Sequence, residues 1–242
     1  MTAVAAARAR ASRLSARPLA GVALAGVVGS VAVDVLLKFL RPGYSLLHNA
    51  ESDYGRGPWF WVMDLNFLLR CALTLALVLA LARAARPEPR LTGGLRLLAV
   101  WAVCSGLLAF FADDVEGQPV HGSGLVHLAL AFLAFCAVTV GTILASVALR
   151  SDPARVRAGS ALLAISFAGA AAFLLLASAA GHKPAPGGLY ERIFLGLQLL
   201  WIAVAAGCVL ASGPVGSADA SGMPETGGRP GRAARRARGA GR

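Results

Sequence analysis

Long apolar runs separated by short polar segments cover most of the chain. Six of these runs are long enough to cross a bilayer: Pro18–Leu40, Pro58–Ala82, Leu95–Phe111, Leu125–Leu149, Ala158–Ala180 and Leu189–Ala211. A hydrocarbon core about 30 Å thick requires about 20 apolar residues in a helix, whereas a transmembrane barrel shows shorter segments that alternate apolar and polar residues. Because lipid cannot satisfy backbone hydrogen bonds, each run is predicted to be helical. The pattern therefore predicts an all-α fold, a polytopic transmembrane six-helix bundle.

The amino-acid composition excludes an ordinary soluble domain. Of the 242 residues, 57% are hydrophobic and only 14% are charged, whereas about a quarter of the residues in an average soluble domain carry charge. The net charge of +11 at pH 7 would indicate a nucleic-acid partner in a soluble protein. Nearly all the basic residues here are arginine, however, and the richness in Arg, Ala and Gly is typical of a GC-rich bacterial genome. We therefore expect membrane lipids as partners, and no nucleic acid.

Basic residues are distributed unevenly between the connecting segments. Seventeen of the 23 Lys and Arg residues fall on the side that carries both termini: Arg8, Arg10, Arg13, Arg17, Arg83, Arg86, Arg90, Arg96, Arg150, Arg155, Arg157, Arg229, Arg232, Arg235, Arg236, Arg238 and Arg242. The opposite side carries five: Lys38, Arg41, Arg56, Lys183 and Arg192. Cytoplasmic loops carry the excess of basic residues in membrane proteins. We therefore predict a multi-pass protein of the cell (plasma) membrane with both termini cytoplasmic.

The chain divides into three regions. Residues 1–17 form a basic cytoplasmic segment, residues 18–211 form the six-helix transmembrane domain, and residues 212–242 form an Arg/Gly-rich cytoplasmic tail that we expect to be disordered. A basic N-terminus before an apolar run is also the pattern of a cleaved signal peptide. The first run is longer than the apolar region of a typical signal peptide, and retaining it gives an even number of spans. We therefore expect it to be retained.

Ionisable side chains inside the predicted spans are expensive to bury and usually have a partner. Asp34 and Lys38 are four residues apart, so they either form an ion pair or Lys38 extends to the membrane surface. Arg70 lies deeper, near the middle of its span, and Asp64 is poorly placed on the same helix to pair with it. The expected partner of Arg70 is therefore Asp34 of the neighbouring span or Asn66. Such a pair has a functional role or simply fixes the helix register.

Histidines and acids gather in one layer at the predicted extracytoplasmic ends of the helices. The members of this layer are His48, Glu51, Asp53, Asp113, Asp114, Glu116, His121, His127, His182 and Glu191. We predict that Asp113, His127, Glu191 and Arg192 converge in one polar cluster, in which a carboxylate orients His127 and Arg192 reaches Asp113. The alternative is a capped and salt-bridged helix layer at the depth of the lipid head groups.

Two kinds of chemistry fit this layer. His121, His127, His182, Asp113 and Glu191 are candidate zinc ligands, although no HExxH motif enforces such a site. Ser52 and Asp53 offer a nucleophile or a pair that positions water, or they form a turn. The other kind is a binding pocket for a lipid or small molecule, closed by the aromatic residues 59–61, which also suit an interfacial belt.

Several short segments resemble a known family. They are Arg41-Pro42-Gly43-Tyr44, Glu51-Ser52-Asp53-Tyr54-Gly55, Phe110-Phe111-Ala112-Asp113, Gly124-Leu125-Val126-His127 and Gly188-Leu189-Tyr190-Glu191-Arg192-Ile193. They resemble, in order and over roughly residues 18–211, the bacterial membrane proteins of domain of unknown function family 998. That family often has proline where Ala112 stands, and it has no settled activity. The resemblance implies that the candidate site residues are Ser52, Asp53, Asp113, His127, Glu191 and Arg192.

These observations lead to two functional hypotheses. The first is a membrane protein with a polar pocket on its extracytoplasmic side that binds a lipid or another envelope component. The alternative is a metal-dependent membrane hydrolase that acts on lipid. Whether the chain is an enzyme stays open at this point.

Overall fold

The computed structural model describes residues 3–114, 122–180 and 185–212. Its elements are α1 (Ala3–Leu40), a short 3-10 helix η1 (Ser52–Gly55), α2 (Phe60–Ala84), α3 (Pro89–Leu108), α4 (Gly122–Arg150), α5 (Val156–Ala179) and α6 (Gly187–Ala211). All six α-helices are long and apolar enough to cross a membrane, and the described residues contain no strand. The predicted six-helix bundle is therefore confirmed, and the chain is a multi-pass membrane protein.

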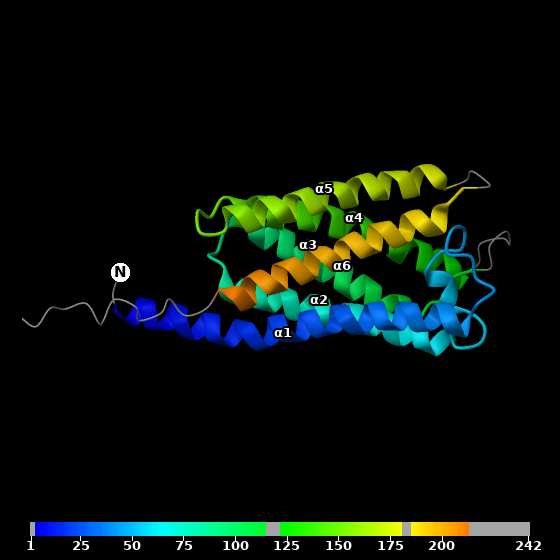
Figure 1. Ribbon diagram of the computed structural model, residues 1–242, viewed down its shortest axis with the longest axis horizontal. Coiled ribbons are helices and arrows are strands. Elements are labelled where there is room, and N and C mark those ends of the chain that lie inside the picture. Colours follow the sequence, from blue (N-terminus) through cyan, green and yellow to red (C-terminus); the bar gives the residue numbers. More distant parts are fainter. Residues whose placement is uncertain (1–2, 115–121, 181–184, 213–242) are drawn as a thin grey trace, which may run out of the picture. The chain divides into compact units, whose positions relative to one another are not determined.

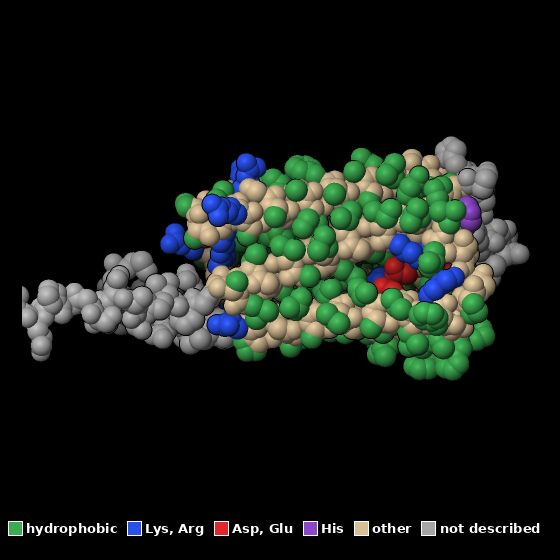
Figure 2. All heavy atoms as spheres, viewed as in Figure 1, with side chains coloured by type: hydrophobic (Ala, Val, Ile, Leu, Met, Phe, Trp, Pro, Cys, Tyr) green, Lys and Arg blue, Asp and Glu red, His purple; other side chains and the backbone are tan. Residues whose placement is uncertain are grey.

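The helices form a closed ring in chain order. Each helix packs against the next one, α6 returns to pack against α1, and α2 also contacts α6. Figure 1 shows the six helices side by side along a common direction. We call the end where residues 41–59 meet the starts of α4 and α6 the loop end. We call the opposite end the arginine end. It carries the α2–α3 and α4–α5 connections, and Figure 2 shows Lys and Arg side chains gathered there.

Small residues allow the helices to approach closely. A Cβ atom added to Gly94 of α3 would lie only 2.8 Å from the carbonyl oxygen of Gly141 and 2.8 Å from the backbone nitrogen of Ala145, both on α4. Contacts between small residues are a common basis of helix association in lipid, where dispersion contacts and interhelical hydrogen bonds replace the hydrophobic effect. This close crossing fixes α4, which carries His127 at the loop end.

A buried hydrogen-bonded group joins α4, α5 and α6 inside the bundle. Trp201 Nε1 donates to Ser146 Oγ at 2.9 Å, and the Ser146 and Ser166 hydroxyls are 3.1 Å apart. Trp201 and Ser146 have no exposed surface. These polar atoms have no water to bind at this depth, so the contacts between them help to specify how the three helices pack.

Helix boundaries differ most from the sequence prediction at the starts of α3 and α1. The third helix begins at Pro89 rather than near Leu95, because Glu88 accepts a hydrogen bond from the Leu91 backbone nitrogen at 2.9 Å and proline is favoured at the first helical position. α1 begins at Ala3, so one helix continues through the predicted basic N-terminal segment. The predicted tail disorder falls on residues 213–242, which lie outside the described residues.

Candidate functional site

Residues 41–59 fold against the bundle at the loop end. The rings of Tyr44 and Tyr54 stack with centroids 5.2 Å apart, and the Arg41 guanidinium lies 4.4 Å from the centre of the Tyr44 ring. Arg41 Nη1 also donates to the Pro58 carbonyl at 2.9 Å. These contacts tie the two ends of the segment together, so the residues between them are held in a defined position.

Lys38 takes part in the same arrangement instead of pairing with Asp34. Its Nζ atom donates to the carbonyl of Tyr44 at 2.7 Å, and no ion pair joins it to Asp34 in the described part of the chain. Of the two sequence alternatives, the ion pair is therefore wrong. The ammonium extends along the helix to the loop, as expected for a lysine near the end of a membrane span.

Arg70 of α2 is the centre of a buried polar network. It is 4% exposed, its Nη2 atom donates to Asp34 Oδ2 at 2.9 Å and forms an ion pair with Glu51, and its Nε atom donates to Ser30 Oγ at 3.1 Å. Asn66 completes the network by donating to Asp34 Oδ1 at 2.6 Å and accepting from Ser30 at 2.7 Å. The predicted pairing of Arg70 with Asp34 is confirmed. The second partner, Glu51, brings the loop into the same network.

Glu191 of α6 joins the loop from the other side. Its Oε2 atom accepts a hydrogen bond from the backbone nitrogen of Glu51 at 2.9 Å, and both side chains are buried. A Cβ atom added to Gly188 would lie 2.1 Å from the Asn49 carbonyl oxygen. Only glycine at that position lets the loop approach α6 closely enough for the Glu191 contact.

Arg192 fixes the loop through backbone carbonyls. Its Nη1 atom donates to the carbonyls of Asn49 at 2.6 Å, Gly188 at 2.9 Å and Leu46 at 3.1 Å. The described residues contain no ion pair between Arg192 and Asp113, so the predicted contact is wrong. The carbonyls of Leu46 and Asn49 lie within hydrogen-bond distance of this side chain. They are outside the helices, so their oxygens are good acceptors for a guanidinium.

Tyr54 lies beneath Arg192, whose guanidinium carbon is 5.9 Å from the centre of the ring. The tyrosine is 2% exposed, and its hydroxyl has no hydrogen-bond partner within the described residues. Burial raises the pKa of Tyr54 above its usual value near 10, and the positive charge of Arg192 opposes this shift. The tyrosine therefore acts as a packing residue that keeps its proton.

Ser52 and Asp53 occupy the short helix η1. Asp53 is buried and forms an ion pair with Arg56, while Ser52 Oγ donates to Asp113 Oδ2 at 3.3 Å. Asp113 also accepts from the Asp114 backbone nitrogen at 2.8 Å. The contact between Ser52 and Asp113 therefore connects η1 to the segment that follows α3.

His127 of α4 has a defined tautomer. Its Nδ1 atom lies 2.7 Å from the Phe111 carbonyl oxygen, which can only accept, so Nδ1 carries the proton and Nε2 is the basic nitrogen. The ring is 4% exposed and meets Phe67 edge to face, with centroids 6.2 Å apart. The prediction that a carboxylate orients this ring is wrong, because the Phe111 carbonyl, in the segment that follows α3, takes that position.

Asp114, another acid of the predicted polar layer, packs on the start of α4. A Cβ atom added to Gly124 would lie 1.9 Å from Asp114 Oδ2. Gly124 therefore makes room for a carboxylate between the end of α3 and the first turn of α4. The negative charge also suits the N-terminal end of a helix.

A cavity of about 670 Å³ lies beneath the loop and extends between the helices. Its polar end is lined by His48, Glu51, Ser52, Asp53, Arg70, Asp113, Asp114, His127 and Glu191. Its apolar part is lined by side chains that include Met63, Phe67, Trp101, Phe132, Phe135, Phe173, Leu176 and Leu195. Five of the six predicted site residues line it, and the exception is Arg192. The cavity thus has a polar end at the loop and an apolar wall within the membrane-spanning segments.

The exposed aromatic residues 59–61 do not line this cavity. Trp59, Phe60 and Trp61 are each about half exposed, and the two indole rings are 6.2 Å apart. The prediction that they close the pocket is therefore wrong. Their exposure at one end of a span fits the interfacial belt that the sequence offered as the alternative.

The zinc hypothesis rested on five side chains, of which His121 and His182 lie outside the described residues. Among those that are described, no group of three or more His, Cys, Asp or Glu side chains is arranged to hold a metal ion. The three described candidates, Asp113, His127 and Glu191, line one cavity without forming such a group.

Sequence reasoning missed the role of Glu51 in binding Arg70 and the role of Phe132, Phe135 and Phe173 in the cavity. Glu51 lies in a loop, and no helical spacing connects it to Arg70. The three phenylalanines resemble all other apolar residues of a membrane span. One signal was available for Glu51, because a buried arginine needs an acidic partner and Glu51 lies in the loop that precedes the span of Arg70.

Comparison with protein families identifies a family that covers most of the chain. Residues 24–207 match the model of a family described as "Protein of unknown function (DUF998)". No curated protein and no solved structure matches the chain.

Proposed function

The chain belongs to the DUF998 family of proteins of unknown function, and from this premise we propose that it binds an amphipathic lipid of the cell envelope in the cavity at the loop end. The observation that carries the proposal is the division of the cavity into a polar end and an apolar wall. Its volume of about 670 Å³ lies within the usual range of small-molecule sites, about 300–1,000 Å³. A lipid placed there has its head group near η1 and its chain against Phe132, Phe135 and Phe173.

The charges at the polar end favour a particular head group. Five carboxylates line this end, with one arginine among them, and that arginine already binds Glu51 and Asp34. A phosphate would meet mostly negative charge there, whereas an amine or a hydroxyl-rich head group would find acceptors. His127 adds the Nε2 lone pair as a further acceptor. The expected ligand is therefore an amphipath whose head group donates hydrogen bonds or carries positive charge.

The arginine end is the cytoplasmic one in this proposal, so the cavity opens toward the extracytoplasmic side of a bacterial plasma membrane. The uneven distribution of basic residues supports this orientation. Reporter fusions test it. A fusion after Ala211 is expected to report a cytoplasmic position and a fusion near Gly117 an extracytoplasmic one, and the reverse pattern would contradict the orientation.

A metal-dependent hydrolase acting on lipid is the second candidate. The observation in its favour is that Ser52 Oγ donates to Asp113 Oδ2 at 3.3 Å, while His127, with a basic Nε2, lines the same cavity. A carboxylate and an imidazole beside a polar head group are groups that can activate water or a hydroxyl. Elemental analysis of the purified protein separates the candidates. A stoichiometric metal ion favours the hydrolase, and its absence favours the binding protein.

A volume change inside the cavity tests the binding proposal. Ala131→Leu adds bulk to the apolar wall, and the matched control is Ala129→Leu, an exposed position on the same helix that does not line the cavity. Lipids that remain bound after purification in mild detergent are identified by native mass spectrometry. We expect one bound lipid class in the wild type and in the control, and its loss in Ala131→Leu. Equal retention in all three proteins would contradict the proposal.

A further inference from the structure

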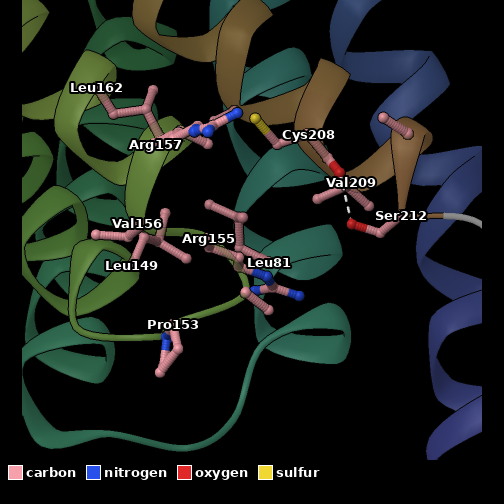
Figure 3. Close-up of a pocket in the computed structure, with 14 residues that line it drawn as sticks. Leu81, Leu149, Pro153, Arg155, Val156, Arg157, Leu162, Cys208, Val209 and Ser212 are labelled. Atoms are coloured by element: carbon pink, nitrogen blue, oxygen red, sulfur yellow. Dashed lines mark hydrogen bonds between the residues drawn. The ribbon is translucent and has the colours of Figure 1, made fainter.

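A second cavity, of about 580 Å³, lies at the arginine end. Figure 3 shows it between the end of α4, the α4–α5 connection, the start of α5, the end of α6 and Leu81 of α2. Its lining includes Arg155, Arg157 and Ala158 at the start of α5 and the apolar residues Leu81, Leu149 and Val209. It shares none of these residues with the cavity at the loop end.

The charge on this cavity is positive. Two arginines line it, and no Asp or Glu does. Arg155 is held in place, because its Nη2 atom donates to the Ala84 carbonyl at 2.8 Å and its Nε atom lies 3.9 Å from Asp152 Oδ2. Arg157 is exposed and extends from α5 toward α6 in Figure 3, and no hydrogen bond or ion pair holds it within the described residues. The cavity therefore offers one positioned guanidinium and one that is available to a ligand.

The interior of this cavity is apolar. Leu81, Leu149, Leu162 and Val209 are all at most 6% exposed and come from α2, α4, α5 and α6. The first turn of α5 adds a weaker attraction for anions, because its N-cap residue, Arg155, makes no side-chain capping hydrogen bond. A ligand that fits has an anionic group at the rim and an apolar chain inside.

We propose that this cavity binds an anionic membrane phospholipid, with the head-group phosphate between Arg155 and Arg157 and an acyl chain against the four apolar side chains. A phosphodiester offers oxygens in the geometry that guanidinium groups bind. Basic pockets between membrane helices have the charge that retains such lipids at a membrane surface. The two ends of the bundle then select opposite head groups, since the cavity at the loop end is lined mainly by carboxylates.

Lipid titration of the purified full-length protein in a neutral detergent tests the site. The probes are phosphatidylglycerol, zwitterionic phosphatidylcholine and inorganic phosphate, and bound lipid is counted by native mass spectrometry. The variants are Arg157→Gln, which removes the available charge, and Ala158→Leu, which reduces the cavity volume without a change of charge. Arg90→Gln is the matched control, because Arg90 is exposed near the same end and does not line the cavity.

We expect phosphatidylglycerol to bind the wild type and the Arg90→Gln control equally, and to bind Arg157→Gln about tenfold more weakly. Ala158→Leu is expected to lose the lipid. If one of the two cavity variants does not fold, the other one tests the proposal. Equal binding to the wild type and to both cavity variants would overturn the proposal. Phosphatidylcholine that binds as well as phosphatidylglycerol would also overturn it. Displacement of the lipid by inorganic phosphate at equal concentration would overturn it too, because the site would then recognise a free anion.

Discussion

Removal of the Arg70 side chain is expected to be strongly destabilising. The guanidinium is 4% exposed and binds Asp34, Glu51 and Ser30. Arg70→Met leaves two carboxylates near one another without a counter-charge, and breaking a buried ion pair in this way costs about 3–5 kcal/mol. Asp34 still accepts a hydrogen bond from Asn66, which compensates part of the loss. We therefore expect a value near the lower limit, about 3 kcal/mol.

A second substitution tests whether the loss comes from unpaired charge. Glu51→Gln keeps the size of the side chain and leaves Arg70 paired with Asp34, so its expected cost is about 1–2 kcal/mol. In the double variant with Arg70→Met only one carboxylate is left unpaired. The cost of the double variant should therefore be smaller than the sum of the single costs by at least about 1 kcal/mol.

The four free cysteines, Cys71, Cys104, Cys136 and Cys208, provide the assay. They lie in membrane helices and are at least partly buried, so the rate at which a thiol reagent modifies them during denaturation in mixed micelles reports unfolding. Arg90→Met is the control and should change the free energy of unfolding by less than about 0.5 kcal/mol. A cost below about 1 kcal/mol for Arg70→Met, or additive costs in the double variant, would refute this account of the network.

Three further substitutions have defined outcomes. Gly188→Ala places a Cβ atom 2.1 Å from the Asn49 carbonyl, so it should separate the loop from α6 and increase protease cleavage within residues 41–59. Trp201→Phe removes the 2.9 Å hydrogen bond to Ser146 and should cost about 1–3 kcal/mol in the same unfolding assay, because a buried hydroxyl loses a partner. Burial raises the pKa of Tyr54 in the folded protein above its usual value near 10. The contribution of Tyr54 to stability is therefore complete below about pH 10 and is lost as the pH rises further. Tyr54→Phe should reduce that loss, measured as the free energy of unfolding between pH 9 and about 11.

The sequence predicted the features that the membrane environment dictates. Six runs of apolar residues had to be helices because lipid offers no backbone partners, and Arg70 had to find an acid at its own depth, which Asp34 provides. Depth along a helix can be obtained by counting residues at 1.5 Å each. Asp113, His127, Glu191 and Arg192 were predicted to form one cluster; the first three line one cavity, and Arg192 does not.

The contacts of Arg192 and His127 could not be predicted in the same way. Both side chains bind backbone carbonyls, of Asn49 and Phe111 respectively, instead of carboxylates. Every residue carries a carbonyl, so no residue type in the sequence marks the ones that are accessible. Their positions depend on the path of residues 41–59 and on where α3 ends, and long-range packing determines both.

Photo-crosslinking with a lipid that carries a photoreactive group on its acyl chain tests the central claim most directly. The lipid is incorporated into membranes that contain the full chain, and the modified residues are located by mass spectrometry of proteolytic fragments. Binding in the cavity at the loop end predicts adducts on its partly buried lining residues Phe135, Phe173 and Leu176, and loss of these adducts in Ala131→Leu. Adducts confined to exposed residues that do not line the cavity, such as Leu133 and Leu174, would contradict the claim.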